Sequence, residues 1–135
     1  MEHGVCAGKT DPALADDDGA RTKAFCAGLA KQFGVNLVAG SVLTRKSGAL
    51  YNTAYVFDRA GACIAEYDKT HPSPPSGKGE AYTAGDQIIT FPLDGIVCIM
   101  IGYDLRFAEL ARAMALSGAK ILFIPAECRG SERSR

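Results

Sequence analysis

The hydrophobic pattern along the chain changes between the period of a helix and the period of a strand. One helix is predicted between Asp18, whose short carboxylate can cap a first turn, and Gly34, which can adopt the left-handed conformation of a helix end. Apolar residues at helical spacing predict a single buried face: Phe25, Cys26, Leu29, Ala30 and Phe33. Before this helix, residues 1–17 have no period and are predicted to be a loop or tail.

Six further segments are rich in β-branched and other apolar residues and are predicted to form strands. They are residues 35–42, 50–57, 62–67, 87–91, 96–101 and 121–124. The second and third are joined by residues 58–61, where Gly61 can supply the positive φ of a hairpin turn. A second helix, ended by Gly118, is predicted between the last two strands. Its buried face comprises Phe107, Leu110, Ala111, Met114 and Ala115.

This order of elements predicts an α/β fold. Antiparallel pairs come early in the chain and a strand–helix–strand unit comes late, which together imply a mixed sheet with helices on one face. Between the two parts lies a loop at residues 69–85, which contains three prolines and three glycines. A loop of that length inside a compact domain is usually functional.

The composition excludes several classes of partner. Of 135 residues, 47% are hydrophobic and 22% are charged, which is typical of a globular domain. Basic and acidic residues number 15 each, so no long-range field favours nucleic acid or an anionic membrane. The N-terminus lacks the pattern of a secretory signal, and no apolar run reaches the roughly 18 residues of a membrane span. We therefore expect a cytoplasmic protein with no nucleic-acid or membrane partner.

The cysteines and histidines predict neither disulfides nor a metal site. Five cysteines are widely spaced, odd in number and without a C-x-x-C pair, which fits reduced thiols. His3 and His71 are far apart, so a zinc site would need ligands from several segments. The glycines around residue 79 lack the G-K-[ST] ending of a phosphate-binding loop. No metal and no cofactor are expected.

The segment with the clearest chemical meaning is residues 96–109. An apolar strand ends, the chain turns at Gly102, and a helix begins. Such corners expose one residue at the top of a sheet, and acyl-transfer enzymes place a nucleophile there because nearby backbone amides can stabilise an oxyanion. Gly102 tolerates a strained backbone but has no atom with which to attack a carbon. Asp104 and Arg106 are expected to pair and to hold the corner's geometry.

These residues resemble the nitrilase superfamily of carbon–nitrogen hydrolases, in its amidase and omega-amidase branch. The family has a strand, then Cys-Tyr-Asp, a hydrophobic residue, Arg-Phe and Pro- or Ala-Glu. Gly102 stands at the cysteine position, and five residues after it match: Tyr103, Asp104, Arg106, Phe107 and Glu109. Upstream, residues 67–71 resemble the family's Tyr-x-Lys-x-His segment, and residues 79–85 resemble the stretch that holds an additional glutamate. The resemblance runs over residues 21–127.

The resemblance implies an αββα sandwich that hydrolyses a carbon–nitrogen bond in a small linear amide or nitrile. In the family, a cysteine thiolate attacks the amide or nitrile carbon, a glutamate is the general base, and a lysine helps to hold the oxyanion. Lys69 corresponds to that lysine, and the Tyr103 backbone N–H would be a second donor. Glu80 would position the substrate or Lys69. His71 is expected to be structural, and a homo-oligomer is expected because family members pack two sandwiches face to face.

Three departures from the family predict that the chain is inactive. Gly102 replaces the nucleophile, and Cys98 cannot substitute because it lies earlier on the strand, about 13 Å away. Nothing in residues 1–20 resembles the Pro-Glu segment of the general base, and the aspartates there look like loop and helix-capping residues. The end of the chain does not resemble the family's continuation. The chain is expected to divide into a tail at residues 1–18, a partial hydrolase domain at residues 19–127 and a non-matching tail at residues 128–135.

Two hypotheses of function follow. In the first, the chain is a truncated or degenerate carbon–nitrogen hydrolase, descended from an enzyme that cleaves small linear amides. In the second, it is a non-catalytic pseudoenzyme that keeps the fold for binding or assembly. A third hypothesis, an unrelated flavodoxin-like binding domain, would need a phosphate-binding loop after its first strand, and that loop is not visible.

Overall fold

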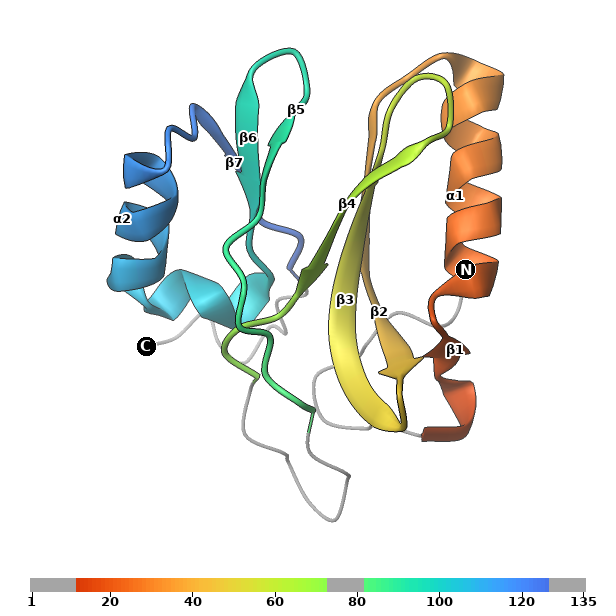
Figure 1. Cartoon of the computed structure of the whole chain (residues 1–135), viewed down its shortest axis with the longest axis horizontal. Helices are drawn as coiled ribbons and strands as arrows, with labels where there is room; N and C mark the ends of the chain where they lie inside the picture. Colours follow the sequence, from red (N-terminus) through yellow and green to blue (C-terminus); the bar gives the residue numbers. More distant parts are fainter. Residues whose placement is uncertain (1–11, 73–81, 127–135) are drawn as a thin grey trace, which may run out of the picture.

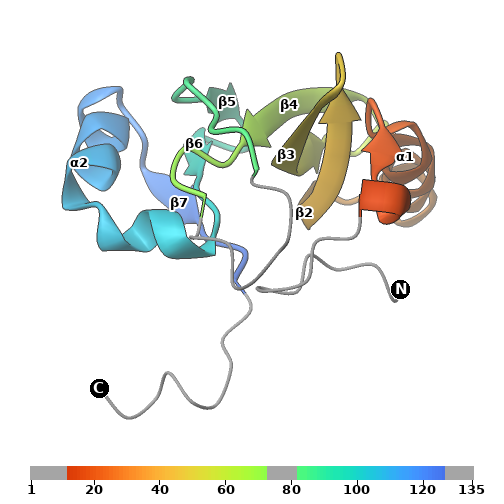
Figure 2. The same ribbon diagram turned by 90° about the horizontal axis from the view of Figure 1, so that it is seen from below.

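The computed structural model describes residues 12–72 and 82–126, and their helices and strands stack in four layers (Figure 1). Helix α1 covers the outer side of one sheet, helix α2 covers the outer side of the other, and the two sheets face each other (Figures 1 and 2). In chain order the elements are η1 (Pro12–Leu14), β1 (Asp16–Asp17), α1 (Ala20–Phe33), β2 (Leu37–Lys46), β3 (Ala49–Phe57), β4 (Cys63–Asp68), β5 (Thr90–Pro92), β6 (Ile96–Ile99), η2 (Gly102–Arg106), α2 (Ala108–Leu116) and β7 (Ile121–Phe123).

The first sheet has the order β1-β2-β3-β4, with β1 parallel to β2 and the other pairs antiparallel. β2 is longer than the predicted strand and continues to Lys46. The extension is possible because Ser47 and Gly48 both have positive φ, 49° and 83°, as a two-residue hairpin of type I′ requires. Three polar residues at the end of β2 therefore pair with the start of β3.

The second sheet has the order β5-β6-β7, with β5 antiparallel and β7 parallel to β6. η2 and α2 connect β6 to β7, so the predicted strand–helix–strand unit is confirmed. The corner after β6 therefore lies at the carboxyl end of a central strand.

The strand β3 contributes to two cores through its alternating side chains. Ala54 and Val56 lie in the core between the two sheets, while Tyr55 and Phe57 lie in the core under α1. α2 buries Leu110 and Met114 as predicted, whereas Ala115, which was expected on the same face, is exposed. The inter-sheet core comprises Ala54, Val56, Ala65, Tyr67, Phe91, Val97, Cys98, Ile99, Met100, Ile101, Leu110 and Met114.

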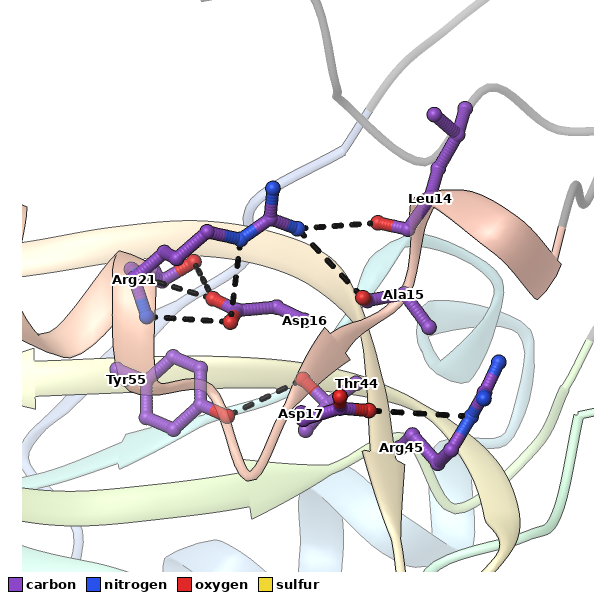
Figure 3. A network of polar contacts seen from close by, with 9 residues as sticks. Leu14, Ala15, Asp16, Asp17, Arg21, Thr44, Arg45 and Tyr55 are labelled. Atoms are coloured by element: carbon purple, nitrogen blue, oxygen red, sulfur yellow. Dashed lines mark hydrogen bonds and ion pairs between the residues drawn. The ribbon is translucent and has the colours of Figure 1, made fainter.

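The start of α1 differs from the prediction. Residues 12–17, expected to be a loop, form η1 and β1, and Asp16 rather than Asp18 satisfies the first turn (Figure 3). The Asp16 carboxylate accepts the Arg21 N–H at 3.1 Å and the Thr22 N–H at 2.8 Å. Asp18 is exposed with a φ of 49°, and Gly19 follows it in the same left-handed region. Pairing of β1 with β2 fixes Asp16 below the helix, which sequence spacing alone did not reveal.

The predicted buried face of α1 is only partly buried. Ala30 is fully buried and Cys26 packs beside it, but Phe25 is 54% exposed and Phe33 is 65% exposed. The small residues face the sheet because the hairpin turn between β3 and β4 comes close to the helix backbone. A Cβ atom on Gly61 would lie 2.6 Å from a carbonyl oxygen of α1. The larger apolar side chains are therefore left on the outer side of the helix.

Candidate active site

Gly102 lies at the corner between β6 and η2, as the sequence predicts. Its φ is 44°, in the left-handed region that glycine adopts without strain. Its N–H donates a 3.0 Å hydrogen bond to the Pro125 carbonyl oxygen, which ties the corner to the segment after β7. A Cβ atom at position 102 would have its nearest neighbours 3.9 Å away, in Pro125 and Ala126. The corner therefore has room for a side chain at this position.

Tyr103 follows Gly102 in the first turn of η2. The first amides of a helix have no acceptor within the helix, and the role of the Tyr103 N–H as a donor to a bound group stays a prediction. The Tyr103 ring packs edge-on against Phe107, with ring centres 5.7 Å apart. The Arg106 guanidinium lies 5.3 Å from the centre of the Tyr103 ring.

Lys69 directly follows β4 and is buried, with 7% of its surface exposed. The backbone N–H of Lys69 donates a 2.9 Å hydrogen bond to the Asn52 carbonyl oxygen, which continues the pairing of β4 with β3. Its ammonium lies 6.0 Å from the centre of the Tyr103 ring. Burial lowers the pKa of Lys69, and the negative charge of Asp104 opposes that shift. The structure thus brings Lys69 to the residue that follows Gly102.

Asp104 is fully buried and makes four polar contacts. Its Oδ1 accepts the His71 backbone N–H at 2.7 Å and lies 3.1 Å from His71 Nδ1. Its Oδ2 accepts the Tyr67 hydroxyl at 2.8 Å and the Ile101 N–H at 3.0 Å. The expected pair between Asp104 and Arg106 is wrong, because Asp104 points into the core while Arg106 is exposed at the end of η2.

His71 is held from two sides. Its ring stacks on Phe107 with centres 3.6 Å apart and planes inclined by 8°, and its Nδ1 faces Asp104. Both contacts fit the structural role expected of this histidine.

The structure shows the environments of two residues near Lys69 that the sequence does not predict. Tyr67 is buried, and its hydroxyl reaches Asp104. The spacing of Tyr67, Lys69 and His71 by two residues was a usable signal, since alternate residues of an extended segment lie on one face. Asn52 is the second. Its Oδ1 is the one buried side-chain polar atom of the described residues that has no hydrogen-bond partner.

The loop that follows Lys69 is closed at its base. The Gly85 N–H donates a 2.9 Å hydrogen bond to the Lys69 carbonyl oxygen. A Cβ atom on Gly85 would lie 2.2 Å from the Asp68 carbonyl oxygen, so a side chain does not fit there. Glu80 lies outside the described residues, and its role beside Lys69 stays a prediction. Cys98, which was discounted as a nucleophile, is fully buried in the inter-sheet core.

The described residues were also compared with the requirements of a metal site, a membrane-spanning helix and a reactive thiol. Across residues 12–72 and 82–126, no three His, Cys, Asp or Glu side chains gather in the manner of metal ligands. No helix in those ranges is long and apolar enough to cross a membrane. Cys26, Cys63 and Cys98 are free thiols, and burial raises the pKa of each.

The sequence and the structure are both similar to proteins of one family. The family described as carbon-nitrogen hydrolase matches residues 7–135. The chain is 41% identical over 115 residues to the 2-oxoglutaramate amidase of Bacillus subtilis, a match that covers 84% of this chain and 44% of that protein. It is 35% identical over 107 residues to the omega-amidase NIT2 of Homo sapiens, covering 72% of this chain and 38% of that one.

The fold is also similar to that of a solved structure from the nitrilase superfamily. Saccharomyces cerevisiae Nit3, described as a member of branch 10 of the nitrilase superfamily, superposes with a TM-score of 0.74 and 28% sequence identity. That match covers 83% of this chain and 41% of Nit3. The predicted sandwich fold is therefore confirmed, and the chain spans less than half the length of each of these three relatives.

Proposed function

Because the chain belongs to the carbon–nitrogen hydrolase family, whose pattern matches residues 7–135, we propose that its corner site holds a small linear amide or nitrile without cleaving it. The amide carbonyl oxygen would lie between the Lys69 ammonium and the Tyr103 N–H. The amidase names of two relatives support an amide as the ligand class. Glu80 would position the substrate or Lys69 from the loop.

The observation that carries this proposal is the state of position 102. The corner keeps a positive φ, a backbone hydrogen bond to Pro125 and open space for a side chain, but the residue is glycine. In a family member with cysteine here, the thiolate forms a C–S bond, the C–N bond breaks and ammonia leaves, and water then hydrolyses the thioester. Gly102 has no side-chain atom that can donate an electron pair to the amide carbon. The polar groups around it can therefore bind an amide but cannot cleave it.

Lys69 is suited to the binding role. An ammonium with little access to water interacts strongly with a carbonyl oxygen, because a low local dielectric weakens screening. Its burial lowers its pKa, while Asp104 acts in the opposite direction and favours the charged form. The negative charge of Asp104 therefore helps Lys69 to keep its positive charge at the corner.

We also propose that the protein works in a reducing compartment, the cytosol. The three cysteines of the described residues are all free, although Cys63 is exposed and Cys26 is partly exposed. Free thiols support a cytosolic location. The test is a count of free thiols in protein isolated from its natural source under non-reducing conditions, where we expect all five to be retained.

The binding proposal is tested by NMR on the ¹⁵N-labelled chain titrated with propionamide. We expect the backbone amide signals of Gly102 and Tyr103 to move together and saturably, with no ammonia released. Lys69→Met should weaken this response at least about fivefold, because it removes the cationic donor and keeps the length of the side chain. Asp94→Asn, an exposed change at a distant ion pair with Arg59, is the matched control and should change nothing. Shifts confined to other residues, or an unchanged titration in Lys69→Met, would contradict the proposal.

A further inference from the structure

Asp104 connects the two halves of the site through groups far apart in the sequence. Tyr67 and His71 lie two residues before and two residues after Lys69, and both donate to the Asp104 carboxylate. Ile101, which directly precedes Gly102, donates to the same carboxylate. One side chain therefore contacts the chain on each side of Lys69 and the residue next to the corner.

We propose that Asp104 is a positioning residue, whose buried carboxylate fixes Lys69 and position 102 relative to each other so that both face one bound group. This inference rests on the proposed function, in which Lys69 and the corner act on the same ligand. Asp104 itself is enclosed by its donors and does not touch that ligand.

The burial of Asp104 makes this connection specific. A carboxylate with no exposure must have its oxygens paired, and here each oxygen receives one donor from a backbone N–H and a second contact from a side chain. The backbone donors fix the ends of two segments, so a shift of either segment leaves a buried charge without a partner. The Tyr67 hydroxyl adds a contact from the end of β4, directly before Lys69.

Asp104 also acts on Lys69 through its charge. Burial lowers the pKa of Lys69, and Asp104 is the carboxylate among residues 12–72 and 82–126 whose charge raises it. The neighbouring Asp68 is different, because its oxygens accept from Lys46 and Thr53. Asp68 therefore provides a matched comparison at the same end of β4.

A thiol introduced at position 102 can report on this geometry without any need for turnover. The Gly102→Cys variant places a thiol where the corner has room for it. A nearby ammonium stabilises a thiolate and lowers the pKa of the thiol. The rate of alkylation by iodoacetamide, followed over pH and assigned to position 102 by peptide mass spectrometry, measures that pKa. Cys63, whose pKa is raised by burial, serves as the internal reference in every sample.

In the Gly102→Cys background, we expect alkylation at position 102 to show a pKa below the ordinary value of about 8.5. Lys69→Met should raise it, slowing the reaction at pH 7 by about fivefold to tenfold. Tyr67→Phe should also slow alkylation at position 102. Asp104→Asn should slow alkylation more than Tyr67→Phe does. Asp68→Asn should leave it unchanged. Circular dichroism and thermal unfolding establish that each variant is folded at the temperature of the assay, and Tyr67→Phe is the mild variant if Asp104→Asn does not fold.

Tyr67→Phe separates positioning from an effect of charge, because it removes one donor to Asp104 and leaves the carboxylate in place. Removing the negative charge of Asp104 without moving Lys69 would make the thiolate easier to form and would speed alkylation at pH 7. Faster or unchanged alkylation in both Tyr67→Phe and Asp104→Asn, with Lys69→Met still slowing it, would overturn the positioning role and leave the proposed function intact. If Lys69→Met itself has no effect, Lys69 does not act at position 102, and the proposed function fails with it.

Discussion

At position 102 the backbone has a φ of 44°, which an L-amino acid with a side chain adopts only with strain. A cysteine held in such a conformation costs roughly 1–3 kcal/mol, a cost that active sites commonly carry. Gly102 relieves that strain while the corner keeps its hydrogen bond to Pro125. On our proposal that position 102 is the nucleophile position, glycine there favours stability at the expense of chemistry.

The sequence was informative about single residues wherever the local pattern determined the answer. Gly102 at a corner and Lys69 at a strand end could both be placed, because an apolar strand precedes Gly102 and a strand with alternating apolar residues precedes Lys69. The partners of Asp104 could not, since Tyr67 and His71 are separated from it by 37 and 33 residues. A charge near in sequence, Arg106, was chosen instead, although the helix turn directs it to solvent.

At the scale of elements, α1 shows how a hydrophobic pattern can mislead. Five apolar residues at helical spacing predicted one buried face, but the helix approaches its sheet through small residues and leaves Phe25 and Phe33 outside. The pattern records which residues are apolar and not which layer covers them. Strand ends were mispredicted for a related reason: the polar end of β2 is paired only because a tight turn follows it.

The capping of α1 gives a test at this scale. Asp16→Asn should lower the free energy of unfolding by about 1–2 kcal/mol, because asparagine has one acceptor oxygen, whereas the two oxygens of Asp16 accept two N–H groups of the first turn and the Thr22 hydroxyl. Burial would raise the pKa of Asp16, but the hydrogen bonds from Thr22 and Arg21 outweigh burial and lower it. The stability from this carboxylate is thus present at neutral pH and lost as the pH falls through the lowered pKa.

The matched control for that change is Asp18→Asn, two residues away. Asp18 is exposed, and asparagine tolerates its left-handed backbone, so we expect a change within about 0.5 kcal/mol. Urea unfolding of both variants at pH 7 makes the comparison. Equal losses, or a larger loss for Asp18→Asn, would mean that the helix is capped as the sequence suggested.

At the scale of the whole molecule, apolar surface remains uncovered on both sides of the sandwich. Phe25 and Phe33 are exposed on α1, and on β7 Ile121 is 48% exposed and Phe123 is 39% exposed. β7 is also the edge of its sheet and borders a groove of about 610 Å³. An apolar edge strand readily pairs with another chain.

We therefore expect the 135-residue chain to associate with itself. Sedimentation velocity at increasing concentration should show dimers or larger species. Phe123→Lys, which places a charge beside the β7 edge, should shift the distribution towards the monomer more than Leu105→Lys, an exposed apolar position on η2 away from that edge. A monomer at all concentrations would contradict the expectation.

We propose that this molecule retains a hydrolase site that lacks its nucleophile. Ammonia release from a panel of short amides and ω-amides tests it most directly, with the unmodified chain, Gly102→Cys and a Lys69→Ala control. We expect no turnover by the unmodified chain. We expect little by Gly102→Cys, because of the aspartates at the start of the described residues Asp16 is engaged by α1 and the exposed Asp17 cannot hold the geometry of a general base. Turnover by the unmodified chain that disappears in Lys69→Ala would contradict this proposal, since it would require a nucleophile other than residue 102.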